Sequence, residues 1–441
     1  MLVYSPSIPA RLRYTCDFIG KELAGNKVEL TNNKEIFRQS AGVKINYSTE
    51  RIGDDEYWLR PHSLLFETGI KEQEVSVFES GGHKTFFPTE GDLSFDIFAA
   101  TFYLLSRYEE YLHYHKDMYG RYDHKNSLAF RENFLDTPLI NSWLQRFKQQ
   151  LANKFSLFPV HYSPFTFLPT YDIDEAYAYK YKSWKRRVGG ATRDLLNGNR
   201  EQFALRRNVL ANKMPDPFDS YDWLDELHNG SGLHPRYFFL AADKTGKYDK
   251  NIFPGEAAWQ ALVQKHTGKY SIGIHPSWQS GDDPSLLKKE IATLEKASGQ
   301  SITSSRQHYI RFNLPVTFRQ LTDAGIREDF SMGYGSINGF RASVASPFYW
   351  YDLEKETTTN LMLYPFCYME ANSFFEQKFT PQQALEEMRH YYQAIKKVNG
   401  TFISIWHNTF LGTTPLFSGW REVYKQFIKE VTGQTETATP G

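Results

Sequence analysis

The sequence predicts an α/β protein in which a smaller α/β unit precedes a larger domain with a parallel sheet. In the second part, short apolar segments alternate with helical segments over roughly 250 residues, as in folds that place a helix after each strand. The stretch 155–164 contains two prolines and separates this part from the pattern before it. A chain of 441 residues is also too long for one ordinary core, so two domains are expected.

Two strands and two helices are expected in the first part. Residues 28–30 and 43–47 have the apolar character of short strands. Residues 92–112 and 138–151 place apolar side chains at helical spacing, and Ser94 or Asp92 can cap the first of these helices.

The second part is expected to alternate strands and helices. The predicted strands are residues 165–168, 237–240, 270–274, 360–363 and 402–405, and the predicted helices are residues 256–266, 284–297, 314–324 and 381–398. The last helix has Thr380 as its N-cap, Pro381 in its first turn and Gly400 just past its end. This alternation fits a barrel or a doubly wound sheet, and in both folds ligands bind beyond the carboxyl ends of the strands.

Composition excludes several classes of protein. The chain has 51 basic and 51 acidic residues, so no net field favours nucleic acid. Its two cysteines, Cys16 and Cys367, are too few for a disulfide framework or a cysteine-rich zinc site. The start of the chain lacks a secretory signal and no segment reaches the ~20 apolar residues of a membrane helix, so we expect a cytoplasmic protein.

One segment departs from this balance of charge. Residues 180–213 contain ten Lys or Arg and only two acids, and they interrupt the alternating pattern. A solvated helical insertion explains this pattern. The alternative is peripheral contact with an anionic surface, through a lipid head group, a nucleotide-sugar phosphate or a charged glycan.

Two carboxylates, Asp172 and Asp174, follow the apolar segment 165–168. Residues two apart on a strand point to the same side, so both acids are expected to project together from a strand end. Two such acids repel each other unless a cation or a proton lies between them. The pair therefore suits a divalent metal ion held by one acid with a water activated beside the other, although a solvated Asp-rich turn gives the same pattern.

Further chemically competent residues follow other predicted strands. His275 follows residues 270–274, Arg306 and His308 follow Ile302, and His407 follows residues 402–405. Because parallel strands present their carboxyl ends at one edge, these side chains are expected to converge. One Asp and two His form a suitable ligand set for a divalent metal ion that keeps one position open for water.

These residues resemble the ordered motifs of NodB-homology polysaccharide deacetylases, which are family-4-type carbohydrate esterases. The matching segments are Thr-Tyr-Asp-Ile-Asp at 170–174, Gly-Ile-His-Pro-Ser at 273–277, Gly-Phe-Arg-Ala at 339–342 and Ile-Trp-His-Asn at 405–408. The resemblance covers roughly residues 164–419. It implies a distorted parallel (β/α) barrel of NodB-homology type at 161–430, an accessory α/β domain at 1–160 and a flexible tail at 431–441.

The resemblance also implies a role for each matching residue. Asp172 matches the general base and Asp174 the first metal ligand. Arg341 matches the arginine that holds the base carboxylate, and His407 matches the histidine that protonates the departing amine. His275 matches the first histidine of the metal pair in the family's second motif.

The sequence departs from the family at the second histidine of that pair, where Gln279 stands. His308 follows a neighbouring strand and could supply the missing imidazole, or it could have a structural role. The expected metal ligands are therefore Asp174, His275 and His308, with zinc as the expected divalent ion.

The function implied is a metal-dependent hydrolase that removes an N-acetyl group from an amino sugar of a glycan, such as a cell-envelope glycan, or of a lipid-linked glycan precursor. A catalytically inactive carbohydrate-binding or scaffold protein with the same fold is the alternative that Gln279 leaves open. A glycosidase is disfavoured, because Asp172 and Asp174 are closer than the roughly 5 Å or more that separate the paired catalytic carboxyls of such enzymes.

Overall fold

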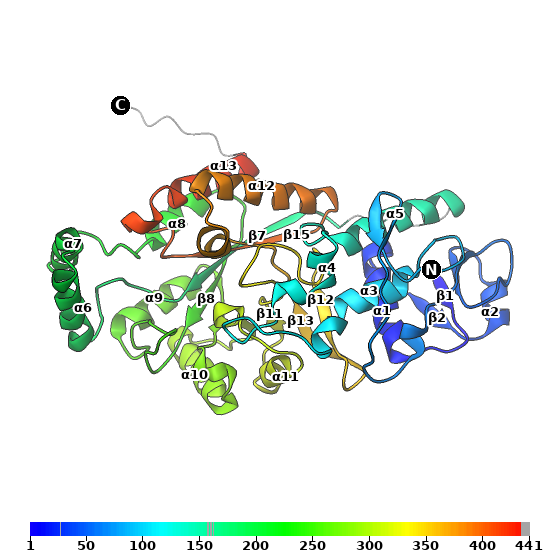
Figure 1. The fold of residues 1–441 in the computed structure, drawn as a ribbon, viewed down its shortest axis with the longest axis horizontal. Helices are drawn as coiled ribbons and strands as arrows, with labels where there is room; N and C mark the ends of the chain where they lie inside the picture. Colours follow the sequence, from blue (N-terminus) through cyan, green and yellow to red (C-terminus); the bar gives the residue numbers. More distant parts are fainter. Residues whose placement is uncertain (27, 157, 159–160, 162, 434–441) are drawn as a thin grey trace.

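Two parallel sheets organise the computed structural model, which describes residues 1–26, 28–156, 158, 161 and 163–433 (Figure 1). In the first sheet the strand order is β2-β1-β3-β4, and every neighbouring pair is parallel. Strands form at both segments where the sequence predicted them. The elements of this part are β1 (Leu2–Tyr4), α1 (Ala10–Ala24), β2 (Glu29–Thr31), α2 (Lys34–Gln39), β3 (Lys44–Tyr47), β4 (Tyr57–Leu59), the hairpin β5 (Phe78–Ser80) and β6 (His83–Thr85), α3 (Ile97–Leu105), α4 (Leu128–Arg131) and α5 (Leu139–Lys154).

The helix expected at 92–112 is shorter than predicted, because its start and end are both fixed by other contacts. Asp96, and neither predicted residue, caps α3 by accepting two backbone N–H groups of its first turn at 2.9 Å. Asp92 instead accepts the backbone N–H of Trp58 on β4 at 2.9 Å. The helix ends before Arg107, whose φ of 53° is left-handed and cannot continue an α-helix.

In the described part of the chain, the second sheet contains nine strands in the order β12-β13-β11-β10-β9-β8-β7-β15-β14. Among these strands, β12 and β13 form the only antiparallel pair. A strand or helix forms at every position predicted for this part. Its elements are β7 (Thr166–Ile173), α6 (Trp184–Leu196), α7 (Arg200–Leu210), α8 (Tyr221–His228), β8 (Arg236–Leu240), α9 (Ala257–Thr267), β9 (Ser271–His275), α10 (Pro284–Ser298), β10 (Ser304–Ser305), α11 (Val316–Asp323), β11 (Glu328–Asp329), β12 (Phe348–Asp352), β13 (Thr357–Leu363), β14 (Tyr368–Met369), α12 (Pro381–Lys397), β15 (Thr401–His407) and α13 (Trp420–Thr432).

The strand pairing of the large sheet is open. β12 and β14 are its outer strands, and within the described ranges no pairing joins them. The prediction of an α/β fold with parallel strands is confirmed, whereas closure into a barrel is not.

The two sheets share one hydrophobic core, which continues from the first part of the chain into the second. α1 contributes to the contact on the side of β12 and β13, where the Tyr14 hydroxyl donates to the Tyr349 carbonyl at 2.7 Å. Arg11, also on α1, forms an ion pair with Glu356. α5 adds a backbone hydrogen bond from Ile140 to the Ser343 carbonyl at 3.0 Å.

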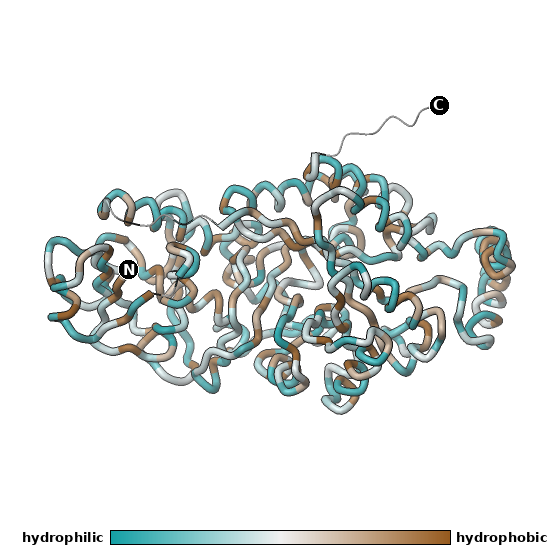
Figure 2. Tube along the Cα trace, turned by 180° about the vertical axis from the view of Figure 1, so that it is seen from behind, coloured by the Kyte–Doolittle hydropathy of each residue, from teal (hydrophilic) through white to brown (hydrophobic). Residues whose placement is uncertain are grey.

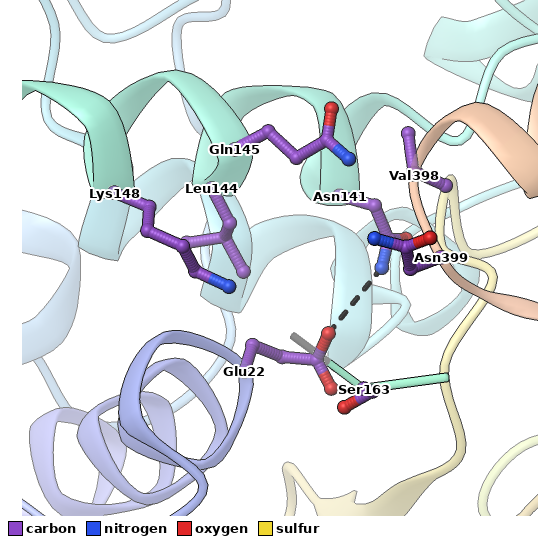
Figure 3. A pocket seen from close by; sticks show the side chains of 8 residues that line it. All are labelled: Glu22, Asn141, Leu144, Gln145, Lys148, Ser163, Val398 and Asn399. Carbon is purple, nitrogen blue, oxygen red and sulfur yellow. Dashed lines mark hydrogen bonds between the residues drawn. The ribbon is translucent and has the colours of Figure 1, made fainter. Parts of the chain in front are cut away.

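A small cavity of about 20 Å³ marks another point of this contact (Figure 3). Glu22 of α1 points toward α5, where it accepts a hydrogen bond from Asn141 at 3.4 Å, and it accepts a second from Ser346 at 2.9 Å. Burial raises the pKa of the Glu22 carboxyl. A cavity of this size holds about one water molecule, so this region is a packed contact between the two parts of the chain and not a ligand site.

α6 and α7 lie at the opposite end of the molecule from β1 and β2 (Figure 1). They form a helix pair, and the tube coloured by hydropathy shows apolar residues on it (Figure 2). None of the helices in the described part is long and apolar enough to cross a membrane.

The predicted domain boundaries remain predictions. The boundary expected after residue 160 falls between the end of α5 and the start of β7. Of the tail expected at 431–441, the first two residues belong to α13, and residues 434–441 lie outside the described part.

Candidate active site

Asp172 and Asp174 lie at the carboxyl end of β7, which extends five residues beyond the predicted strand 165–168 to Ile173. Asp172 is almost fully buried at 2% exposure, and Asp174 is partly exposed. Both line a cleft of about 710 Å³. β7 lies between β8 and β15 in the sheet, so a neighbouring strand flanks the two acids on each side.

His275 ends β9 and faces Asp174. Its Nδ1 lies 2.6 Å from the backbone carbonyl of Arg306, which can only accept, so the neutral ring carries its proton on Nδ1. The lone pair of Nε2 is therefore directed at Asp174 Oδ1, 3.1 Å away. Both atoms are buried, and among the described residues neither has a hydrogen-bond partner. Two electron-pair donors that face each other in this way require a cation or a proton between them.

His308 faces the other oxygen of the same carboxylate. Its Nε2 lies 3.4 Å from Asp174 Oδ2, and its Nδ1 lies 2.9 Å from Asp249 Oδ1. Burial lowers the pKa of His308, but Asp174 and Asp249 outweigh this and raise it to about 9. The carboxylate of Asp249 orients the ring, as acids commonly do behind metal-bound histidines.

The backbone after His308 is strained. Tyr309 and Ile310 have φ values of 59° and 54°, in a region that side chains rarely occupy and that is least favourable for a β-branched residue. Arg121, from the first part of the chain, donates to the Tyr309 carbonyl at 2.7 Å and is itself held by Asp117 at 2.6 Å. The turn is thus fixed from outside the large sheet.

Asp174, His275 and His308 could hold one metal ion, because one ligand atom of each lies within 4.8 Å of the others. A carboxylate with two imidazoles is the donor set that suits Zn²⁺ with an open position. The facing lone pairs of Asp174 and His275 add a second reason to expect a cation here. The structure therefore brings together the three ligands predicted from the sequence, and their role in metal binding stays a prediction. Gln279 is exposed and lines a different cavity.

His407 ends β15 beside the same carboxylate. Its Nε2 lies 3.6 Å from Asp174 Oδ2, and its Nδ1 and backbone N–H both lie 2.7 Å from Glu370 Oε1. Burial lowers the pKa of His407, but Glu370 and then Asp174 raise it to about 10. His407 is thus held as a protonated imidazole at the cleft, which it helps to line.

The contact predicted for Arg341 is made by another arginine. Arg306 Nη1 donates to Asp172 Oδ1 at 2.8 Å, and both side chains are buried. Arg341 lies elsewhere and donates to both carboxylate oxygens of Glu110, at 2.8 and 2.6 Å. The prediction for Arg341 was wrong because a motif fixes a position in the chain and not the direction in which the side chain points.

Arg341 belongs to a buried charge cluster at the contact between the two parts. Arg107 donates to Glu110 at 2.8 Å and to Glu109 at 2.7 Å. Burial raises the pKa of Glu110, but Arg341 and Arg107 outweigh this and lower it. The cluster holds the first part against the large sheet.

Two contributors to the site carried no signal in the sequence. Asp249 lies in the loop after β8, and Glu370 follows the two-residue strand β14. Neither follows a periodic segment, so only the observation that every ligating histidine needs an orienting partner could have prompted a search for them.

The first part of the chain also contributes to the cleft wall. Tyr119 lines the cleft beside Tyr309, with ring centroids 5.4 Å apart, and its ring also contacts Tyr248 and Trp278. Of these rings, Tyr119 and Tyr309 line the cleft and give it an aromatic wall.

Residues 1–156 match a family of unknown function, DUF7033. No curated protein matches the chain.

Solved structures resemble the chain at low similarity. A presumed polysaccharide deacetylase from Mycobacterium smegmatis is 14% identical, with a TM-score of 0.39 over 63% of this chain and 90% of that chain. A polysaccharide deacetylase from Bacillus cereus is 10% identical, with a TM-score of 0.30 over 63% and 95%. A pseudoenzyme of the CE4 family from Bacillus anthracis is 11% identical, with a TM-score of 0.31 over 62% and 63%.

Proposed function

We propose that the protein is a metal-dependent hydrolase that removes the N-acetyl group from an amino sugar of a glycan or lipid-linked glycan precursor, on a barrel of NodB-homology type. The observation that carries the proposal is the pair of facing electron-pair donors, Asp174 Oδ1 and His275 Nε2, 3.1 Å apart and without hydrogen-bond partners in the described part of the chain. His308 completes a three-residue ligand set around them.

Asp174, His275 and His308 would hold the ion, for which we propose zinc. When bound, a divalent ion of this kind supplies a Lewis acid that polarises the amide carbonyl and acidifies water. Each histidine is already turned with Nε2 toward Asp174, because Nδ1 is held by Arg306 or Asp249.

Asp172 is the general base of the proposed reaction. It lines the cleft beside Asp174 but is not a member of the ligand set. Its hydrogen bond from Arg306 keeps the carboxylate oriented toward the cleft, where it takes the proton from the water that attacks the acetyl carbon.

His407 is the general acid. Its pKa of about 10, raised by Glu370 and Asp174 against the effect of burial, keeps the imidazole protonated at neutral pH. As the carbon–nitrogen bond breaks, His407 gives its proton to the sugar nitrogen, so that a neutral amine and acetate leave.

Metal content and acetate release test the proposal together. We expect the purified protein to bind about one zinc ion per chain and to release acetate from an N-acetylated amino-sugar oligomer. His275→Ala and His308→Ala should each lose both properties. The matched control Gln279→Ala should keep them, because Gln279 lines another cavity.

Two results would contradict the proposal in different ways. A protein that binds no divalent ion at neutral pH would exclude the metal site altogether. A protein that binds zinc and glycan without releasing acetate from any N-acetylated sugar tested would instead be the inactive carbohydrate-binding form of this fold.

A further inference from the structure

A second cavity, of about 450 Å³, lies beside the cleft and shares two lining residues with it, Glu175 and Lys250. Within the described residues Glu175 is the only acid in its wall. Most of the wall comes from α6 and α7, the helix pair at the end of the molecule (Figure 1). Six cationic side chains line this basic cavity: Lys182, Lys185, Arg186, Arg193, Arg206 and Lys250.

The structure neutralises only some of these charges. Lys182 pairs with Glu175 at 2.8 Å, and Arg206 pairs with Asp194 at 2.7 Å. In the part of the chain that is described, the other cations, Lys185, Arg186, Arg193 and Lys250, have no carboxylate partner; the guanidinium of Arg186 donates to two backbone carbonyls. Like charges around one cavity repel each other unless an anion lies between them.

The helix that carries these cations leaves room for such an anion. Gly189 lines the cavity, and a Cβ there would meet no atom within 4 Å. Gly190 also lines it, and a Cβ at that position would come within 2.6 Å of the Arg206 guanidinium. A larger residue at 190 would thus push Arg206 from its place, whereas glycine lets it approach α6.

We propose that the basic cavity binds the phosphate or diphosphate of a substrate whose amino sugar occupies the cleft. Guanidinium and ammonium groups are the usual protein ligands of phosphate. Glu175 and Lys250 line both cavities, so the cavities are adjacent. One substrate can therefore place its sugar in the cleft and the phosphate joined to that sugar in the basic cavity. The inference rests on the proposed function, since it names the substrate class of the same site.

Binding of inorganic pyrophosphate to the full-length protein tests this site directly. In calorimetry we expect wild-type binding to weaken about tenfold or more in the double variant Lys185→Glu/Arg193→Glu, which removes two charged contacts. Arg200→Glu/Arg207→Glu is the matched control, because it makes the same charge change on α7 outside the cavity, and it should bind as wild type. Pyrophosphate could also bind an ion in the cleft, so the titration is repeated in His275→Ala, where binding to the basic cavity persists.

The outcomes separate this inference from the proposed function. Loss of pyrophosphate binding in His275→Ala, equal binding by the Lys185→Glu/Arg193→Glu and Arg200→Glu/Arg207→Glu variants, or no binding by the wild type would each overturn the basic cavity as a phosphate site. None of these results depends on catalysis, and zinc content reports on the cleft separately. Comparison of uridine diphosphate with farnesyl diphosphate identifies the carrier, because the tighter ligand shows whether a nucleotide or a lipid bears the phosphate.

A separate observation concerns another face of α6. Trp184, Val188 and Leu195 are spaced so that they fall on one stripe of the helix, and they are 69%, 56% and 55% exposed. Lys185, Arg186 and Arg193, by contrast, line the basic cavity. α6 is therefore amphipathic, with its apolar stripe exposed.

We infer that this apolar stripe docks on an anionic lipid surface. An exposed stripe of Trp, Val and Leu on a helix rich in Lys and Arg is the pattern of helices that lie in a membrane interface. Residues 180–213 hold ten cations and two acids, so the charge around the stripe complements anionic head groups.

Co-sedimentation with lipid vesicles tests the stripe. We expect the wild type to bind vesicles of phosphatidylcholine with phosphatidylglycerol, and to bind less at high salt or without phosphatidylglycerol. Val188→Ser/Leu195→Ser should abolish binding, whereas Val316→Ser, an equally exposed valine on α11 (55%), should not. Failure of the wild type to bind anionic vesicles would overturn the inference. So would a wild-type dimer that this double variant converts to a monomer, because a second copy would then cover the stripe.

Discussion

The two sheets of this chain differ in whether the polar side chains at their strand ends have hydrogen-bond partners. In the small sheet, Asn46 and Glu56 are buried, but Asn46 donates to Glu56 at 2.8 Å and Ser48 donates to Asn46 at 2.6 Å. In the large sheet, Asp174 and His275 are as close, yet their facing atoms have no hydrogen-bond partner among the described residues.

The comparison shows which polar strand ends can bind a ligand. Where side chains satisfy one another, as in the small sheet, the cluster stabilises the fold and needs no further partner. Where two acceptors face each other, the fold leaves a requirement that only a cation or a proton meets. Whether polar residues at a strand end already have hydrogen-bond partners therefore says more about ligand binding than how close together they lie.

The largest effect, a loss of catalytic rate, is expected for a substitution at Asp172 of the large sheet. Asp172→Asn should lower kcat by about 10²–10⁴-fold, because the amide cannot take a proton from water. Zinc content should not change, since Asp172 is not among the three candidate ligands. Steady-state kinetics and metal analysis of the same preparation measure both. Unchanged kcat would assign the base role to another residue.

The next effect concerns the charge cluster that joins the two parts. Glu110→Ala leaves Arg341 and Arg107 buried without their shared carboxylate, which should cost about 3–5 kcal/mol of unfolding free energy. Denaturant unfolding measures this, and Glu90→Ala is the control, because the Arg60–Glu90 pair is exposed and should contribute less than about 1 kcal/mol. Equal losses in the two variants would show that the cluster does not stabilise the contact.

The stability that Glu110 contributes should also depend on pH. Its folded-state pKa is lowered, so the stabilisation is fully present above its ordinary pKa of 4.5 and is lost as pH falls through the folded value. The stability difference between wild type and Glu110→Gln should therefore narrow below about pH 4.5. A difference that widens on acidification would contradict the sign of this shift.

A smaller effect, on zinc affinity, is expected at Asp249, which orients the candidate ligand His308. Asp249→Asn weakens the support of His308 and should reduce zinc affinity about 10–100-fold without removing a ligand. Competition with a chelator measures the affinity. An affinity equal to that of wild type would place His308 outside the metal site.

The smallest effect on function is expected in the small sheet. Glu56→Ala removes the acceptor for Asn46 and for the backbone N–H of Ile52, which should cost about 1–3 kcal/mol of stability. kcat and zinc content should equal those of wild type. A fall in either would mean that the strand ends of the two sheets are not functionally distinct.

The sequence was sufficient to predict the alternating elements and the convergence of Asp174, His275 and His308. Asp174 and His275 follow strands whose apolar segments are recognisable, and parallel strands bring such ends together. His308 follows a strand of only two residues, β10, and the sequence signals it only by Ile302. His308 lies close to His275 because β10 pairs with β9, which agrees with the expectation that neighbouring strand ends meet.

The sequence could not predict contacts that depend on side-chain direction or on short elements. The resemblance assigned Arg341 as the partner of Asp172, whereas in the structure Arg306 makes this contact and Arg341 pairs with Glu110. Glu370 follows a strand of two residues, too short for a periodic pattern. The helix predicted at 92–112 was too long, because a local cap at Asp96 sets its start and the left-handed backbone of Arg107 sets its end.

The hydrogen bond from Arg121 to Tyr309 bears on whether the large sheet can form its candidate site without the first part of the chain. Tyr309 and Ile310 occupy costly backbone conformations, and part of what holds them comes from residues before the large sheet. A shortened chain beginning at β7 would keep every candidate ligand but lose this support, and the turn could relax to an ordinary conformation that carries His308 away from Asp174. The part of the chain that contains the large sheet and all three candidate ligands thus depends on the first part, which contains none of these ligands, to hold the turn that positions His308.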